Sequence, residues 1–180
     1  MTAVDDRLEL DEPRPFWSQL GRTVVIVSLI GLAIFWVWAL FFASKESVNR
    51  VDDREWAARA EAICAEVRPQ LAALDRQESA DLNVRADLVV TSTDLLSKML
   101  DDVMAVPPAD EKGQAIVPDW IADYRQLLDD RYAYAERLRS GENVPFTETA
   151  VRGVPITERI ETFAGDNEMR SCRPPRGGVL

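Results

Sequence analysis

The amino-acid sequence predicts a mostly α protein, in which one transmembrane helix precedes a small antiparallel bundle of three long helices and one short helix. Three observations support this fold class: a 21-residue uncharged run, apolar side chains that recur every three or four residues in later segments, and no segment with the alternation of a strand. The part that follows the uncharged run, about 135 residues, has the size of one ordinary domain, so we expect a single core.

The uncharged run covers residues 23–43, between Arg22 and Lys45. At ~1.5 Å per residue, a helix of this length crosses the ~30 Å hydrocarbon layer of a bilayer. Backbone amides in lipid must be satisfied within the segment, which favours a helix, and membrane lipid is therefore an expected partner. A buried core helix and a cleaved signal peptide are the alternatives. A signal peptide needs a shorter apolar region and a small-x-small site, which Phe41 and Ala43 match poorly.

Five segments follow from this interpretation. We expect a disordered cytoplasmic head (1–22), the transmembrane helix (23–43), a juxtamembrane linker (44–51), an extracytoplasmic helical bundle (52–172) and a flexible tail (173–180). The basic residues that flank the span are balanced between its two sides, so they do not decide the orientation. The two cysteines decide it.

Both cysteines, Cys64 and Cys172, lie in the predicted bundle, near its two ends. A bridge between them would persist in an oxidising compartment, which places the bundle outside the cell membrane. Two unrelated buried thiols are the alternative.

The first bundle helix is expected over residues 52–74, because Trp56, Ala60, Ile63 and further apolar residues fall on one face. Pro69 lies inside this helix and predicts a kink or a break near Val67. The second helix is expected over residues 82–106, with a stripe that ends at Val106 before two prolines.

The third helix is expected to follow a polar linker over residues 109–114, with Pro118 in its first turn, and to end near Ser140 before Gly141. A short fourth helix is indicated by Ile156, Ile160 and Phe163. Consecutive helices with short connections favour antiparallel packing.

The composition argues against most catalytic chemistry. The chain has no histidine, neither cysteine belongs to a CxxC pair, and no glycine-rich phosphate loop is present. Adjacent acids such as Asp101 and Asp102 diverge on a helix and are expected to be solvated, and the loop 165–168 lacks the spacing of a calcium loop. We therefore predict no catalytic, metal-binding or cofactor-binding residues and no cofactor.

Charge excludes one class of partner. From Ser44 onward the chain carries 26 acidic and 18 basic residues, a net charge near -8, which repels nucleic acid. The arginines of the third helix, among them Arg125 and Arg131, alternate with acids, and this spacing predicts intrahelical pairs such as Arg125 with Asp129.

In overall plan the chain resembles uncharacterised single-pass membrane proteins of actinobacteria. The residues that carry the resemblance are the early helical cysteine in Ala62-Ile63-Cys64-Ala65, the break Val106-Pro107-Pro108-Ala109-Asp110 before a tryptophan-bearing helix, and the late Cys172. The resemblance implies a location in the cell envelope and a cysteine bridge. It implies no activity and no site residues.

These observations predict a non-enzymatic envelope protein whose bundle is an interaction or structural module, with another envelope protein as a candidate partner. The alternative is a bundle that binds an apolar ligand near Trp56 and Trp120, although both side chains could simply be core. A hydrolase that depends on carboxylates alone is the third hypothesis. The span has no GxxxG pattern around Gly31, and the oligomeric state stays open.

Overall fold

The computed structural model describes residues 16–41, 48–77 and 79–175. Its contacts divide the chain into two units, Met1–Glu46 and Ser47–Leu180, and we describe each by itself. The predictions for residues 1–15 of the head, for 42–47 and for 176–180 of the tail lie outside the described residues.

The first unit contains helix α1, Phe16–Phe41, which begins before the predicted start of the span at Thr23. Within α1, Gly21–Leu40 is 20 residues long, has a mean hydropathy of 2.5 and is not buried. Among the described residues this is the one helix that is long and apolar enough to cross a membrane. A signal sequence has the same properties, so the structure supports a membrane or secreted location.

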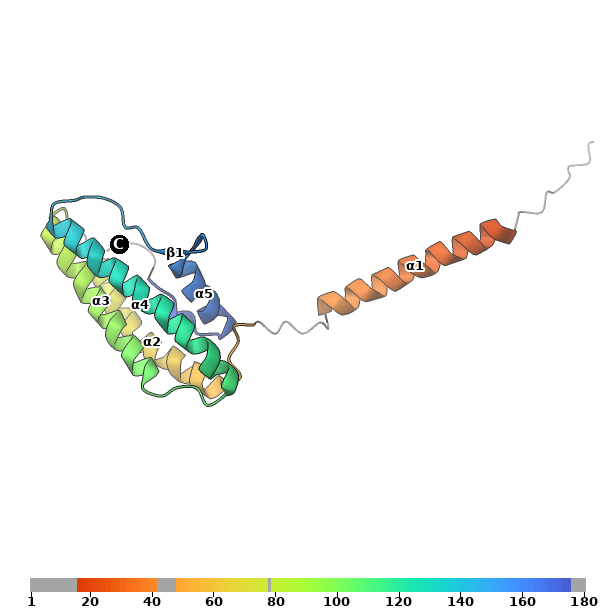
Figure 1. The fold of residues 1–180 in the computed structure, drawn as a ribbon, viewed down its shortest axis with the longest axis horizontal. Coiled ribbons are helices and arrows are strands. Elements are labelled where there is room, and N and C mark those ends of the chain that lie inside the picture. Colours follow the sequence, from red (N-terminus) through yellow and green to blue (C-terminus); the bar gives the residue numbers. More distant parts are fainter. Residues whose placement is uncertain (1–15, 42–47, 78, 176–180) are drawn as a thin grey trace, which may run out of the picture. The chain divides into compact units, whose positions relative to one another are not determined.

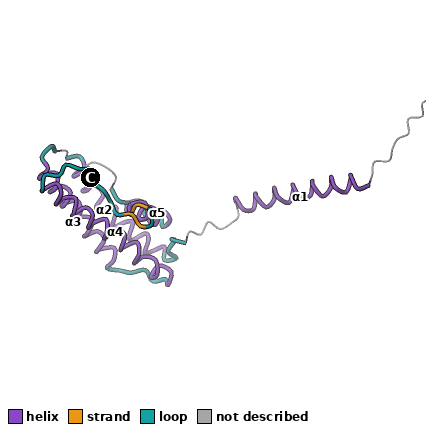
Figure 2. Tube along the Cα trace, turned by 45° about the horizontal axis from the view of Figure 1, so that its top comes forward, coloured by secondary structure: helices purple, strands orange, loops and turns teal. Residues whose placement is uncertain are grey.

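The second unit is the helical bundle, and it confirms the predicted fold class. Its three long helices α2, α3 and α4 lie side by side and antiparallel, and the short helix α5 runs along α4 (Figure 1). The 3-10 turn η1 packs against α2, and a small antiparallel pair of strands, which the sequence analysis did not predict, precedes α5 (Figure 2). The bounds are α2 Arg54–Asp75, α3 Leu82–Met104, α4 Glu111–Arg139, β1 Ala150–Val151, β2 Val154–Pro155, α5 Ile156–Asp166 and η1 Arg170–Cys172.

Each long helix of the bundle begins at an aspartate, whose carboxylate accepts hydrogen bonds from the otherwise unpaired amides of the first turn. Asp53 caps α2 through the amide of Trp56, and Asp81 caps α3. Asp110 caps α4 through the amide of Gly113, so α4 starts well before Pro118. The predictions of a polar linker over 109–114 and of Pro118 in a first turn are therefore wrong.

The capping carboxylates of α2 and α4 also accept hydrogen bonds from the backbone that leads into the other helix. The Asp53 amide donates to Asp110 Oδ1 (3.0 Å), and the Ala109 amide donates to Asp53 Oδ2 (3.0 Å). Hydrogen bonds from the amides of Ala109 and Trp56 lower the pKa of Asp53. Partial burial would raise the pKa of Asp110, but the amides that donate to its carboxylate outweigh burial and hold that pKa below its usual range. We call this arrangement the cap junction.

The cap junction leaves no room for a side chain at Gly113. A Cβ atom there would lie 2.6 Å from Asp110 Oδ1 and 2.8 Å from both Val51 Cγ1 and Pro108 Cβ. Val51 is fully buried against the bundle. Gly113 is therefore required by the close approach of the two helix starts.

The end of α4 follows the sequence prediction closely. Gly141 has φ +88°, its amide donates to the Leu138 carbonyl, and the next amide donates to Arg137. This pair of bonds satisfies the last carbonyls of the helix, and the left-handed backbone favours glycine.

The core is built around aromatic rings from three helices. Trp120 stacks on Phe163 with a centroid distance of 5.2 Å and meets Trp56 and Tyr124 edge to face. The predicted apolar face of α2 is buried at Trp56, Ala60 and Leu71, and α2 continues through Pro69 without a break. Val106, by contrast, lies beyond the end of α3 and is 52% exposed, so its predicted place in the buried stripe is wrong.

The structure contains the predicted disulfide between Cys64 and Cys172, and both residues are fully buried. Further bonds hold the same chain end: the Ser171 amide and hydroxyl donate to Glu61 (2.8 and 2.7 Å), and the Tyr124 hydroxyl donates to the Cys172 carbonyl (3.0 Å). The segment η1 is thereby fixed to α2 and α4.

Candidate functional site

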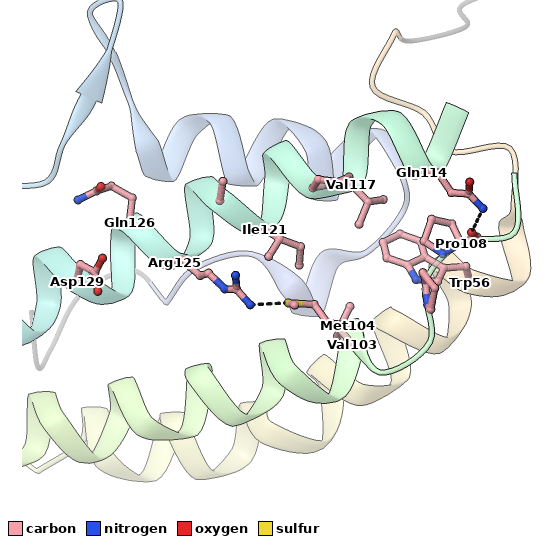
Figure 3. A pocket seen from close by; sticks show the side chains of 13 residues that line it. Trp56, Val103, Met104, Pro108, Gln114, Val117, Ile121, Arg125, Gln126 and Asp129 are labelled. Carbon is pink, nitrogen blue, oxygen red and sulfur yellow. Dashed lines mark hydrogen bonds between the residues drawn. The ribbon is translucent and has the colours of Figure 1, made fainter. Parts of the chain in front are cut away.

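A cleft of about 540 Å³ lies between the end of α3, the loop that follows it and one face of α4 (Figure 3). We call it the α3–α4 cleft. Nine of its lining residues are apolar or contribute aliphatic surface: Trp56, Val103, Met104, Pro107, Pro108, Val117, Pro118, Ile121 and Ala122. Four are polar or charged: Gln114, Arg125, Gln126 and Asp129. Clefts of ~300–1,000 Å³ with mostly apolar walls and a few polar groups are typical of ligand sites.

The loop wall of the cleft is held in place from the core. The Trp56 indole is buried, and its Nε1 donates to the Val106 carbonyl at 3.0 Å. Gln114 Nε2 donates to the Pro108 carbonyl at 3.1 Å, from the start of α4. Because two prolines also restrict this loop, the wall is set by the fold rather than by a ligand.

The helical wall is one stripe of α4, from Gln114 to Asp129, with lining residues three or four positions apart. Pro118 lies within this stripe. Proline has no amide hydrogen, so α4 lacks the bond to the Gln114 carbonyl that another residue would make there. The stripe is apolar from Val117 to Ala122, and its charged end begins at Arg125.

Arg125 does not make the predicted pair with Asp129. The ion pairs of the described residues do not include one between these two side chains. Its guanidinium instead reaches across the cleft, where Nη2 donates to Met104 Sδ at 3.3 Å (Figure 3). A thioether is a weak acceptor. The exposed Arg125 side chain therefore presents a cation where the apolar stretch of the cleft meets its polar end at Gln126 and Asp129.

Trp56 and Trp120, which the alternative hypothesis placed at one apolar site, line two different hollows. Trp56 belongs to the α3–α4 cleft, whereas Trp120 lines a smaller hollow of about 330 Å³ between α4 and α5. That second hollow has Asp119, Asp123 and Glu158 in its wall, and Arg159 neutralises Asp123 at 2.8 Å.

In each pair of adjacent acids, 52–53, 101–102 and 129–130, one carboxylate has a structural partner. Asp53 caps α2, Asp102 pairs with Lys98 at 2.7 Å, and Asp130 accepts from the amide of Thr149. In the loop 165–168, the Asn167 side chain is buried and binds backbone groups of the chain entering the bundle. Over the ranges that the structure describes, no group of three or more His, Cys, Asp or Glu could hold a metal ion.

Arg131 is one of the arginines for which the sequence predicts intrahelical pairs, and it does not make one: the residue is buried, 1% exposed, and binds hydroxyls of α3. Its Nε donates to Thr93 Oγ1 at 2.9 Å, and its Nη2 donates to Ser92 Oγ. Burial lowers the pKa of Arg131 to about 10, so it is still protonated at neutral pH. Both of these acceptors are hydroxyls, and Arg131 is a structural cation rather than part of the cleft.

Comparisons with protein-family models, with curated proteins and with solved structures each found no match. The resemblance to actinobacterial single-pass membrane proteins therefore stays a prediction. What can be concluded about function rests on the geometry of this chain.

The cleft as a whole was not predicted from the sequence. Its signal in the sequence was the set of apolar residues Val117, Pro118, Ile121 and Ala122, which widens the apolar side of α4 to the exposed positions 118 and 122. The second signal was the pair Pro107 and Pro108 opposite that run.

Proposed function

We propose that the protein is a non-enzymatic, membrane-anchored binding module of the cell envelope, and that its α3–α4 cleft takes an apolar ligand. The cleft carries this proposal: it has the volume and the mostly apolar lining of a ligand site, and its walls are held by bonds from the core. Met104 in the cleft wall and Val106 in the loop next to it, 38% and 52% exposed, add to the exposed apolar surface.

Two features support the anchor and the location. Gly21–Leu40, at ~1.5 Å rise per residue, has the length of a ~30 Å hydrocarbon layer. The bridge between Cys64 and Cys172 is of a kind that persists in oxidising compartments. We infer that α1 stays attached as an anchor, with the N-terminus in the cytoplasm and the bundle outside.

The lining of the cleft favours binding over hydrolysis. Acid–base cleavage by carboxylates needs two of them facing one bond, and Asp129 is the one carboxylate among the described lining residues. Another envelope protein whose apolar segment enters the cleft stays the second hypothesis, since Met104 and Val106 are exposed beside it.

The binding function is tested with a photoreactive amino acid at Ala122, an exposed residue of the cleft wall. Ala133, exposed on the same helix and outside the cleft, is the matched control position. After irradiation of cells that express the full chain, we expect an adduct at position 122 and none at 133. The mass of the adduct separates a small ligand from a protein. No adduct at 122, or equal adducts at both positions, would refute the proposal.

The orientation is tested with single added cysteines and a membrane-impermeant maleimide on intact cells. Ala133→Cys, in the bundle, should be labelled without lysis, and Thr2→Cys, in the head, only after lysis. The native cysteines do not interfere, because they are bonded and fully buried. The reverse pattern would place the bundle in the cytoplasm.

A further inference from the structure

The α3–α4 cleft is amphipathic along its length, and this narrows the chemistry of its ligand. From Gln114 to Arg125, a rise of about 16 Å along α4, the walls are mainly apolar. At the far end of this stretch lies the guanidinium of Arg125, which donates to the sulfur of Met104. A ligand that matches both parts has a long apolar body and one polar head.

The charge of the head follows from Arg125. Its planar fork of N–H donors matches a carboxylate, to which it can donate two parallel bonds, and such charge-assisted bonds are roughly twice as strong as neutral ones. The contact to the Met104 thioether is weak and at the protein surface, so a carboxylate can replace it at little cost. An anionic head at this end is therefore favoured over a neutral one.

The number of charges on the head follows from Asp129. This acid lies one turn beyond Arg125 in the same wall of the cleft, and the chain from Ser44 onward carries a net charge near -8. Each additional negative charge on a ligand is repelled by the Asp129 carboxylate and by the net negative charge of the bundle. The site therefore favours a single negative charge over the two of a phosphate monoester.

We propose that the α3–α4 cleft binds a long-chain fatty acid, with its chain along Val117, Pro118 and Ile121 and its carboxylate on Arg125. This inference rests on the proposed function, because it names the ligand class of the same cleft. Since the proposed anchor keeps the protein at a membrane, the bilayer is the source of the acid. Each methylene that leaves water adds to the affinity, while Arg125 supplies the selectivity for the acid.

The test uses the full chain in cell membranes and a fatty acid that carries a photoreactive diazirine in its chain. After irradiation and digestion, mass spectrometry gives the ratio of adducts in the cleft peptides to adducts in the peptide of the span, which is the internal reference. We expect this ratio to fall by on the order of tenfold for Arg125→Gln, the loss of one charge-assisted interaction. Arg152→Gln, at an exposed arginine outside the cleft, should leave the ratio unchanged.

Two further arms separate the role of the head from that of the apolar walls. The matched fatty alcohol should label the cleft weakly and without dependence on Arg125. Ala122→Trp, which fills the cleft from an exposed position, should abolish cleft labelling by both probes. A photoreactive alkyl phosphate should label less than the acid and should gain from Asp129→Asn.

Equal cleft labelling by acid and alcohol, or a ratio that Arg125→Gln leaves unchanged, would overturn the fatty-acid inference. If the fatty acid does not label the cleft while the photoreactive residue at position 122 still captures another species, the ligand class is wrong and the binding function stands. If position 122 captures nothing either, the proposed function fails as well.

Discussion

Replacing both bridge cysteines, in Cys64→Ala/Cys172→Ala, removes a bond that closes a loop with a sequence separation of 108. In the chain-entropy model, closing a loop of this length restricts the unfolded chain by about 4.8 kcal/mol at 25 °C. A domain of this size has a total unfolding free energy of ~5–15 kcal/mol. The double variant is therefore expected to lose about a quarter or more of its stability.

The hydrogen bonds that Ser171 and Tyr124 make beside the bridge do not involve the sulfur atoms, so we expect most of the loss to arise in the unfolded state. The bonds from Ser171 to Glu61 and from Tyr124 to the backbone at position 172 remain available in the variant. They still hold η1 against α2 in the variant. Without the bridge, however, η1 can detach without unfolding of the whole bundle, and this limits the loss of unfolding free energy. We expect a decrease of about 4 kcal/mol in the free energy of unfolding, within the usual range for native bridges.

The assay is urea unfolding of the full chain in detergent micelles, followed by tryptophan fluorescence. With a slope of about 2 kcal/mol/M, the midpoint should fall by about 2 M. Ser171→Ala is the control, since it removes a side-chain bond to Glu61 but keeps the bridge, and should lower the midpoint far less. A double variant within 1 kcal/mol of the wild type would refute the loop-closure reasoning.

Three further predictions concern packing and charge. Gly113→Ala should lower the free energy of unfolding by about 1–3 kcal/mol, because the new methyl group overlaps Val51 in the cap junction; an unchanged melting temperature would contradict this. Arg131→Met replaces a buried cation that has hydroxyl acceptors by an apolar chain of similar length, so the free energy of unfolding in urea should be unchanged or higher. A decrease of more than about 3 kcal/mol would show that the cation is needed. The lowered pKa values of Asp53 and Asp110 contribute stability that is present above the unfolded-state pKa near 4 and is lost as the pH falls through the folded-state values. Between pH 5 and pH 2, Asp53→Asn/Asp110→Asn should therefore lose less stability than the wild type, and equal slopes would rule out this contribution.

Several elements of the fold were predictable because their signals are local. The stop at Gly141 needs a residue that tolerates positive φ, and the short helix α5 follows from three apolar residues spaced over two turns. The bridge from Cys64 to Cys172 was predictable because the chain offers two cysteines and both lie in the predicted bundle.

Other features depended on contacts between distant segments. Pro69 was expected inside a helix with a kink or a break, and Pro118 in a first turn; both lie inside continuous helices, since packing of the apolar faces outweighs one lost backbone bond. Arg131 was expected to pair with acids of its own helix, and it is instead buried against α3, where it donates to a hydroxyl.

By itself the sequence determined the mostly α class, the apolar segment near the N-terminus, the long helices and the cysteine pair, since periodicity, length and composition are properties of neighbouring residues. Only the tertiary structure decided that Trp56 and Trp120 face different hollows and that Arg125 spans a cleft toward Met104 rather than pairing with Asp129. The physical reason is that a cleft is made by surfaces left uncovered when helices pack, and that depends on the angle and offset between α3 and α4, which no local pattern encodes.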